Sequence, residues 1–246
     1  MTQYGRLFAT CRLPVPGRDT VYSFTDSKHI IVAAKRQFFS VEVLGNDGQI
    51  LPQGSSYLIA ALERVLQLAN EGSNNAVPVG ILTSEHRDTW ATARKKLEVS
   101  RINRDSLHLL DTALFILVLD DAPGRNLQTT APLMLHSDGK NRWFDKIQLI
   151  VCQDGVAGVN MEHAPLDGHT ALRYLTDISG EMLSWKGEVP HSNTPTPTGA
   201  LESGVRKLAW DLPSSSPVHA AIKSASANFD ALIASTETQV LRQNFE

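Results

Sequence analysis

A histidine and an aspartate four positions apart are the residues of this chain with the clearest chemical use. They stand where a strand pattern gives way to a helix pattern, in the stretch Met161-Glu162-His163-Ala164-Pro165-Leu166-Asp167-Gly168. A neutral histidine titrates near physiological pH, so His163 can take a proton from an alcohol or a thiol and return one later. Asp167 can fix the imidazole ring, or a neighbouring arginine, through a charge-assisted hydrogen bond. The stretch therefore predicts a site with one general base and one orienting carboxylate.

A purely structural role is the alternative for the same residues. A single histidine beside a turn is more often a satisfied structural residue than a base, and Asp167 can simply stabilise the first turn of a helix by its charge. Pro165 stiffens the turn and suits the start of a helix through Leu172 and Leu175. Gly168 would let the backbone come close to a neighbouring group. Taken alone, the spacing favours the structural role, because short motifs often mislead.

The elements expected to position this stretch are a hairpin before it and a helix after it. Residues 146–152 and 156–162 predict two strands joined by a turn at Gln153-Asp154-Gly155. The apolar run 114–119 is the best candidate for a central strand. Further patterns predict strands over 29–34, 37–44 and 77–82, and helices over 55–72 (capped by Ser55 or Ser56), 84–97 (capped by Ser84), 105–110 and 217–241. Strands and helices mix without strict alternation, so we expect an α/β fold with a mixed sheet and helices packed on it.

Composition excludes several classes of protein. The chain has 246 residues, 42% of them hydrophobic, and a net charge of −3, which gives no electrostatic case for binding nucleic acid or an anionic membrane. Cys11 and Cys152 lie far apart and suggest neither a disulfide framework nor a thiolate zinc site. No apolar run is long enough to cross a bilayer, and no secretory signal is visible. We also predict no metal site, because His86, His136, His169, His191 and His219 show no ligand spacing.

Three further strings accompany the histidine stretch. They are Phe8–Asp19, the turn Gly80–Trp90 and the string Asn141-Arg142-Trp143-Phe144-Asp145-Lys146. With these strings in this order and at this spacing, the chain resembles the choline/carnitine O-acyltransferases over most of its length, most weakly between residues 180 and 216. The resemblance implies a fold like that of chloramphenicol acetyltransferase and reversible transfer of an acyl group between coenzyme A and the hydroxyl of carnitine or choline.

The resemblance also implies roles for individual residues. His163 matches the family's catalytic histidine, which deprotonates the alcohol in one direction and the coenzyme A thiol in the other, without an acyl-enzyme. Asp167 matches the acidic residue that helps to hold an arginine and the site geometry, and Glu162 receives no catalytic role. The implied substrates are acyl-CoA and carnitine or choline, with no bound cofactor. The full-length protein is expected to be a monomer in mitochondria, peroxisomes or cytosol.

The other strings have structural interpretations of their own. We interpret residues 141–146 as scaffold rather than as a substrate contact, because aromatic residues at the entry to a strand usually fill cores. Arg142 and Asp145 can pair with each other, while Trp143 and Phe144 can pack. The Gly80–Trp90 turn is likewise interpreted as structural, with His86 and Arg87 as solvated loop residues. The proline-containing segment 192–203 predicts a loop or strap across the surface.

Family members are much longer than this chain. The resemblance implies a second half of the domain that has no counterpart here. That half would hold a Ser-Thr-Ser motif, which stabilises the developing oxyanion, and most of the residues that bind coenzyme A and carnitine. Hydrogen-bond donors to an oxyanion typically stabilise the transition state by several kcal/mol. A long predicted helix running to the end without Gly or Pro also suggests a cut sequence, although a natural frayed end is possible. We therefore expect residues 1–246 to be a partial domain that holds the base without a complete site.

Several alternatives stay open at this point. The overall similarity favours carnitine over choline and short acyl groups over long ones. A second enzyme reading is a plant-type or peptide-synthetase-type transferase of the same wider fold, against which the strings at 10–19 and 141–146 argue. A non-enzymatic alternative is an inactive, truncated fragment, which would leave apolar surface exposed.

Overall fold

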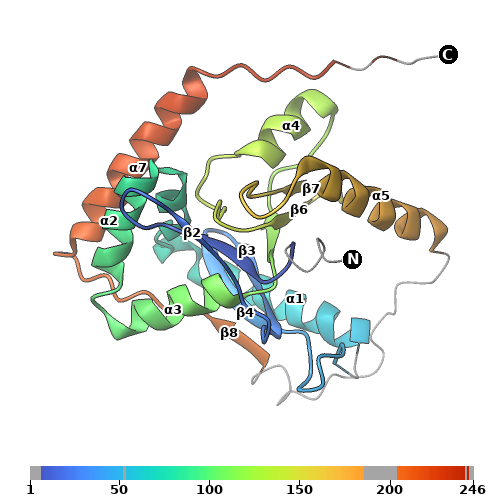
Figure 1. Cartoon of the computed structure of the whole chain (residues 1–246), viewed down its shortest axis with the longest axis horizontal. Coiled ribbons are helices and arrows are strands. Elements are labelled where there is room, and N and C mark those ends of the chain that lie inside the picture. Colours follow the sequence, from blue (N-terminus) through green and yellow to red (C-terminus); the bar gives the residue numbers. More distant parts are fainter. Residues whose placement is uncertain (1–6, 52–53, 186–203, 242, 244–246) are drawn as a thin grey trace.

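A six-stranded mixed sheet forms the centre of the chain, as a computed structural model shows for residues 7–51, 54–185, 204–241 and 243 (Figure 1). Its strand order is β7-β6-β5-β3-β4-β8. The strands are β3 (His29–Ala34), β4 (Gln37–Glu42), β5 (Ile116–Asp120), β6 (Gln148–Cys152), β7 (Ala157–Asn160) and β8 (Val205–Lys207). Strands β3, β5 and β6 run parallel, whereas β4, β7 and β8 pair antiparallel to their neighbours. The predicted α/β fold with a mixed sheet is confirmed.

Both faces of the sheet are covered, and the sequence of β3 shows why. Alternate side chains of a strand point to opposite faces, so an uninterrupted apolar run needs cover on both sides. Ile31 and Ala33 join one buried cluster, whereas Ile30 and Val32 join the other. Helix α1 (Gly54–Gly72) supplies the second cluster with the residues Tyr57, Ala61, Val65 and Ala69.

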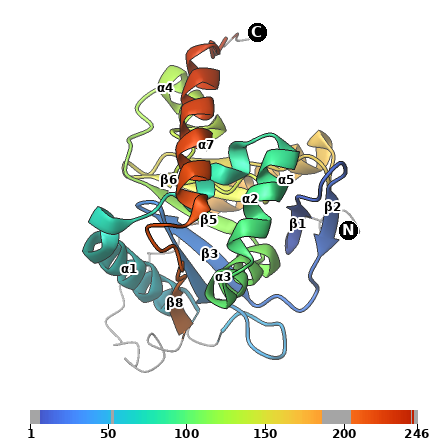
Figure 2. The same ribbon diagram turned by 90° about the vertical axis from the view of Figure 1, so that its left-hand side faces the viewer.

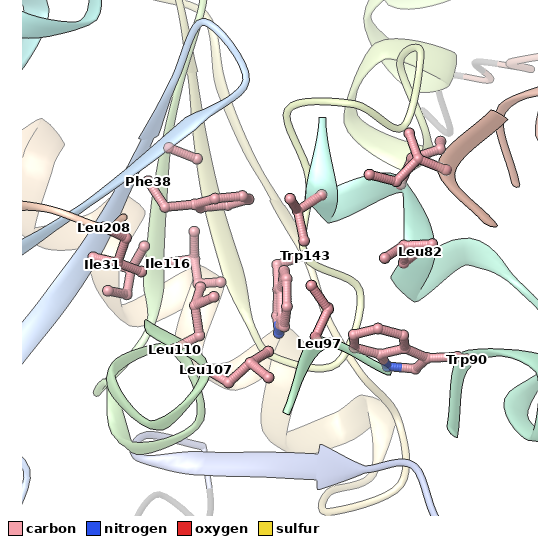
Figure 3. Close-up of a cluster of buried hydrophobic side chains, with 14 of the residues drawn as sticks. Ile31, Phe38, Leu82, Trp90, Leu97, Leu107, Leu110, Ile116, Trp143 and Leu208 are labelled. Atoms are coloured by element: carbon pink, nitrogen blue, oxygen red, sulfur yellow. The ribbon is translucent and has the colours of Figure 1, made fainter. Parts of the chain in front are cut away.

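The first cluster is the larger core and lies under several helices. These are α2 (Arg87–Leu97), α3 (Arg101–Thr112) and α7 (Pro217–Ala234), together with the 3-10 turn η3 (Val79–Ser84). Figures 1 and 2 show α1 on one side of the sheet and α3 on the other. Trp143 lies in the middle of this core, with its ring edge-on to Phe38 at 5.7 Å and to Trp90 at 5.8 Å between centroids (Figure 3).

The remaining elements are a short hairpin, two helices and a 3-10 turn. The short hairpin of β1 (Thr10–Leu13) and β2 (Thr20–Ser23) forms a sheet of its own. Helix α4 (Leu127–Leu135) contacts β7, α5 (Gly168–Ser184) follows β7, and a single 3-10 turn, η2 (Ser73–Asn75), follows α1. The sequence patterns did not predict β1, β2, α4 or β8. The segment 192–203, for which a loop or strap was predicted, lies outside the described residues.

Several predicted boundaries and caps are wrong. Residues 77–82 were expected to form a strand, but Val79–Ser84 is a 3-10 turn in which the Thr83 and Ser84 hydroxyls donate to the carbonyls of Gly80 and Ile81. Ser84, Ser55 and Ser56 are not helix caps, because α2 begins at Arg87 and α1 at Gly54. Helix α3 is longer than predicted.

Helix α7 ends at Ala234 rather than near Leu241, so the long helix that suggested a cut sequence is shorter than predicted. The hydroxyls of Ser235 and Thr236 both donate to the carbonyl of Leu232, which gives the last turn an alternative to further helical hydrogen bonds. Leu241 is 93% exposed, so burial of its side chain does not favour an extension of the helix.

The string Asn141–Lys146 is scaffold in this structure, but its charges pair differently from the prediction. Arg142 does not pair with Asp145. It donates instead to Asp120 and to the carbonyl of Leu133, both at 2.8 Å, and so fixes the end of α4 to the end of β5. Lys146 is fully buried and donates to the carbonyls of Thr10 and Asp111. Burial lowers the pKa of Lys146.

Gly80 supplies a sharp test of this packing. A Cβ at residue 80 would collide with the backbone carbonyl of Arg142, which cannot move without displacing the buried segment. We therefore expect Gly80→Ala to lower the free energy of unfolding by about 1–3 kcal/mol, as measured by urea denaturation. Gly168→Ala is the matched control, because nothing lies within 4 Å of a Cβ at that helical position. Equal effects of the two substitutions would contradict this account.

Candidate active site

His163 lies in the turn between β7 and α5, with its side chain exposed to solvent. The hairpin that leads to it is confirmed: β6 and β7 pair antiparallel, and Gly155 takes a positive φ of 82° in the connecting turn. Glycine suits this conformation because it lacks the Cβ that clashes there. No hydrogen bond or ion pair of His163 is found within the described part of the chain. Its imidazole is thus open to solvent in the described part of the chain.

Asp167 is the N-cap residue of α5. Its Oδ1 accepts hydrogen bonds from the backbone N–H of Thr170 at 2.8 Å and from the Thr170 hydroxyl at 3.1 Å. These hydrogen bonds lower the pKa of Asp167. The carboxylate has no hydrogen bond to His163 or to an arginine among the residues described. The capping role that the sequence left as an alternative is therefore the one seen in this geometry.

Two smaller predictions concern Pro165 and Gly168 in this turn. Pro165 precedes α5 rather than beginning it, because the helix starts at Gly168. The expected close approach to Gly168 stays a prediction, since no group of the described chain lies within 4 Å of a Cβ at that position. The turn from residue 161 to 167 is thus longer and more open than the sequence pattern indicated.

Glu162 is the residue through which the turn is tied to the rest of the chain. Both of its carboxylate oxygens lie 3.3 Å from Nη1 of Arg12, which belongs to β1. Its Oε1 also accepts a hydrogen bond of 2.9 Å from the backbone N–H of Ala164. The residues on both sides of His163 are therefore held by one carboxylate.

Arg12 continues into a chain of alternating charges. Its Nε lies 2.6 Å from Asp19, whose carboxylate also pairs with Arg87 at 2.5 Å. Arg87 in turn donates to Asp145 at 2.6 Å, and the indole N–H of Trp90 donates to the same carboxylate at 2.8 Å. Arg87 is consequently not the solvated loop residue that the sequence predicted, although His86 beside it is exposed.

The charges along this chain shift each other's pKa values. Burial alone would raise the pKa of Asp19, but the hydrogen bonds and charges of Arg87 and Arg12 bring it below its usual value. Burial would lower the pKa of Arg87, yet Asp145 and Asp19 raise it. Asp145 is 1% exposed, and desolvation raises its pKa to about 6.

A shallow hollow of about 550 Å³ opens beside this turn. Its wall is formed by helix α4, the end of β7 and the string Asn141–Lys146. Met161 and Glu162 also line it, so the hollow lies next to the histidine turn. The lining residues are Ala131, Met134, Leu135, Phe144, Val159, Asn160, Met161 and Glu162. The amide of Asn160 donates to the carbonyls of Met134 and Leu135, which fixes α4 at this edge. Six of the eight lining residues are apolar, whereas Asn160 and Glu162 add polar groups to the wall.

Helix α5 leads away from the histidine turn (Figure 1), and within the residues described Thr170 is its one buried residue. Tyr174 lies edge-on to Phe8 at 5.6 Å between ring centroids. The outer side is apolar and exposed, with Leu172, Leu175, Met182, Leu183 and Trp185 all at least 37% exposed. These side chains therefore contribute little to the buried core of the described chain.

Other kinds of site are not seen in the ranges that the structure covers. No group of three or more His, Cys, Asp or Glu residues there could hold a metal ion. Within the same ranges, no helix is long and apolar enough to span a bilayer. Cys11 and Cys152 are both free and buried.

Sequence reasoning found the histidine turn but missed the residues that hold it. Arg12 and Arg87 fall within strings that carried the family resemblance, yet nothing in their local spacing predicts a pairing across 150 and 58 positions, respectively. The available signal was the presence of charged residues inside the strings that carried the resemblance. Such residues are rarely buried without a partner of opposite charge.

The pH dependence of stability tests the buried end of the charge chain. Because the pKa of Asp145 in the folded protein, about 6, exceeds the ordinary 3.8, the folded state holds this proton more tightly than the unfolded chain. The contribution of Asp145 to the free energy of unfolding is thus complete below about pH 4 and is lost as the pH rises to about 6. We expect the free energy of unfolding of the wild-type protein, minus that of Asp145→Asn, to fall by on the order of 2 kcal/mol over this pH range. Urea unfolding at each pH measures it, and a flat or rising difference would count against the assignment.

The cap of α5 supports a second prediction. Asp167→Ala should speed amide exchange in the first turn of α5, because the N–H of Thr170 loses its acceptor. Asp167→Asn should leave exchange near the wild-type rate, because asparagine caps about as well as aspartate. Hydrogen exchange of peptides covering residues 166–174 makes the comparison. Equal exchange in both variants would show that the cap contributes nothing.

Comparison with known proteins identifies relatives over almost the whole chain. The profile of the family described as Choline/Carnitine o-acyltransferase matches residues 1–245. Carnitine O-palmitoyltransferase 2, mitochondrial, of Mus musculus is 38% identical over 232 residues, which are 94% of this chain and 34% of that protein. The same-named protein of Homo sapiens is 36% identical over 94% of this chain and 34% of its own length. Carnitine O-acetyltransferase of Homo sapiens is 37% identical over 73% of this chain and 31% of its own length.

The chain thus spans about a third of the length of the curated relatives it matches. The match extends through the histidine turn and through the strings that hold it. The chain belongs to the choline/carnitine O-acyltransferase family.

Proposed function

We propose that residues 1–246 are the histidine-bearing part of a carnitine O-acyltransferase with a fold like that of chloramphenicol acetyltransferase. The observation that carries the proposal is the position of His163 inside the family match, exposed in a turn that is tied down on both sides. The mixed sheet that ends in the β6–β7 hairpin supports the fold assignment.

In the proposed reaction, His163 acts as a general base. Its neutral imidazole takes the proton of the carnitine hydroxyl while the hydroxyl oxygen attacks the carbonyl carbon of the acyl-CoA thioester. The carbon–sulfur bond then breaks, and the imidazolium returns the proton to the coenzyme A sulfur. The reverse reaction uses the same proton transfers in the opposite order. No acyl-enzyme and no bound cofactor are required.

Asp167 has a supporting role in this proposal. As the N-cap of α5 it fixes the end of the turn that begins at Glu162, and so limits how far His163 can move. The negative charge of Asp167 could contribute to the reaction independently of the capping hydrogen bonds. Asp167→Asn retains the cap and removes the charge, so a loss of activity in that variant would assign a role to the charge itself.

Carnitine is the proposed acyl acceptor because the relatives compared above are named carnitine acyltransferases. Choline is the alternative, which the family description includes. The expected preference for short acyl groups stays a prediction, since relatives named for palmitoyl and for acetyl transfer both match at similar identity.

The test uses the polypeptide encoded by the complete reading frame that contains these residues. We expect His163→Ala and His163→Gln to lower kcat by about 10²–10⁴-fold, the usual contribution of a general base. His86→Gln is the matched control, because His86 is exposed and makes no side-chain capping bond at the start of α2. Assays with carnitine and choline, each with acetyl-CoA and palmitoyl-CoA, identify the preferred pair. Full activity of the His163 variants would refute the proposed base, and faster transfer to choline would refute the proposed acceptor.

The 246-residue chain itself is a separate case, because it spans only about a third of its relatives. We propose that it is inactive or nearly so by itself, since the resemblance places the oxyanion donors outside it. Appreciable acyl transfer by the purified chain would overturn this. A cooperative thermal transition would show that the chain folds independently, whereas its absence would favour an unstable fragment.

A further inference from the structure

We propose that Arg12 is a positioning residue for His163, acting through the carboxylate of Glu162. The proposal rests on the proposed function, because it assumes that His163 is the base. It assigns a role to the charge chain Glu162–Arg12–Asp19–Arg87–Asp145, which lies outside the histidine turn except at its first member.

The contact between Arg12 and Glu162 restrains the histidine from both sides. Glu162 directly precedes His163, and its carboxylate accepts from the backbone N–H of Ala164, which directly follows it. The same carboxylate lies 3.3 Å from Nη1 of Arg12 through both oxygens. Without Arg12, the carboxylate keeps only a local hydrogen bond within an exposed turn. With Arg12, the turn is attached to strand β1.

Arg12 can transmit this restraint because it is itself fixed. Its Nε pairs with Asp19 at 2.6 Å, and its backbone N–H donates to the carbonyl of Asp145 at 3.0 Å. Asp19 is shared with Arg87, whose other partner Asp145 is almost fully buried against Trp90. Along this series each charge between the two ends has an opposite charge on both sides, which offsets much of the cost of removing it from water. The series therefore runs from the rigid core to the exposed turn.

The geometry favours positioning over direct binding of a substrate by Arg12. The Nε and Nη1 atoms of its guanidinium are already occupied by Asp19 and Glu162. Its side chain is 31% exposed, and the carboxylates of Glu162 and Asp19 beside it are 15% and 11% exposed. An anionic substrate would have to displace one carboxylate and approach the other. A positioning residue needs no such rearrangement.

A general base whose position is not restrained transfers protons more slowly, because proton transfer needs close approach and alignment of the reacting atoms. We expect Arg12→Met, in the protein from the complete reading frame, to lower kcat by about 10–100-fold, with KM for carnitine and for acyl-CoA changed by less than about threefold. The Ala164 amide should exchange its hydrogen about tenfold faster, as measured in short peptides covering residues 161–167. Arg12→Lys, which keeps the positive charge, should recover part of both losses.

Two further variants complete the experiment. Glu162→Gln keeps an oxygen for the Ala164 amide but removes the charge that Arg12 holds, so its kcat should fall between those of the wild-type protein and Arg12→Met. Arg64→Met on α1 is the matched control, because its only hydrogen bond among the described residues joins it to Gln67, and it should change neither kcat nor exchange at Ala164. Thermal unfolding of each variant confirms that it is folded before its activity is compared.

Each other outcome overturns the proposal in a recognisable way. A raised KM with kcat unchanged would make Arg12 a substrate-binding residue. A lowered kcat with unchanged exchange at Ala164 would show that Arg12 acts by another route, and faster exchange without loss of kcat would show that the restraint is irrelevant to the reaction. If the wild-type protein transfers no acyl group, the proposed function fails, while unchanged exchange in Arg12→Met would by itself refute the restraint.

Discussion

Burial of three charges within one short segment is the constraint on which this structure depends. Arg142, Asp145 and Lys146 are at most 1% exposed, although each would be far more stable in water than in an unpaired buried position. Each must therefore meet its partners, and those partners come from separate elements: Asp120 at the end of β5, Arg87 and Trp90 on α2, and the carbonyls of Thr10 and Asp111. One segment thereby links β1, α2 and α3 to strand β5 of the sheet.

This segment positions the candidate site through two series of connections. The covalent route runs from Lys146 into β6, through the hairpin to β7 and so to His163. The electrostatic route runs from Asp145 through Arg87, Asp19 and Arg12 to Glu162. Both begin at adjacent residues and end at adjacent residues. The turn is consequently held both by strand β7 and by the ion pairs that end at Glu162. These two attachments explain how an exposed turn can keep a defined position.

How much of this was predictable depends on how local each interaction is. Strand β3, the central β5 and the β6–β7 hairpin follow from short apolar runs and an Asp-Gly turn, and all three were predicted. The strand predicted over 77–82 failed because its apolar residues are also those of a buried 3-10 turn, and the close contact of Gly80 with Arg142 that decides between them is distant in sequence. The role of Arg87 was missed for the same reason, since only the fold brings it to Asp19 and Asp145. His163 and Asp167 could be predicted as candidate site residues because their spacing is local, whereas Arg12, which contacts the turn through Glu162, lies 150 positions away in the sequence.

The proposed role of His163 as a general base for two substrates sets opposing requirements, and the geometry around His163 meets both. The base must be exposed to reach an alcohol and a thioester, so burial cannot hold its ring in place. It must also be held closely, because proton transfer is sensitive to displacement. The two carboxylates at the ends of the turn separate these demands: Glu162 fixes the backbone N–H of Ala164, and Asp167 fixes that of Thr170. Both act on the main chain and leave the imidazole free. In this arrangement the acidic residues flanking the histidine contribute to the proposed reaction through the geometry of the backbone, and Arg12 matters because it connects that backbone to the core by a route that does not pass through the β6–β7 hairpin.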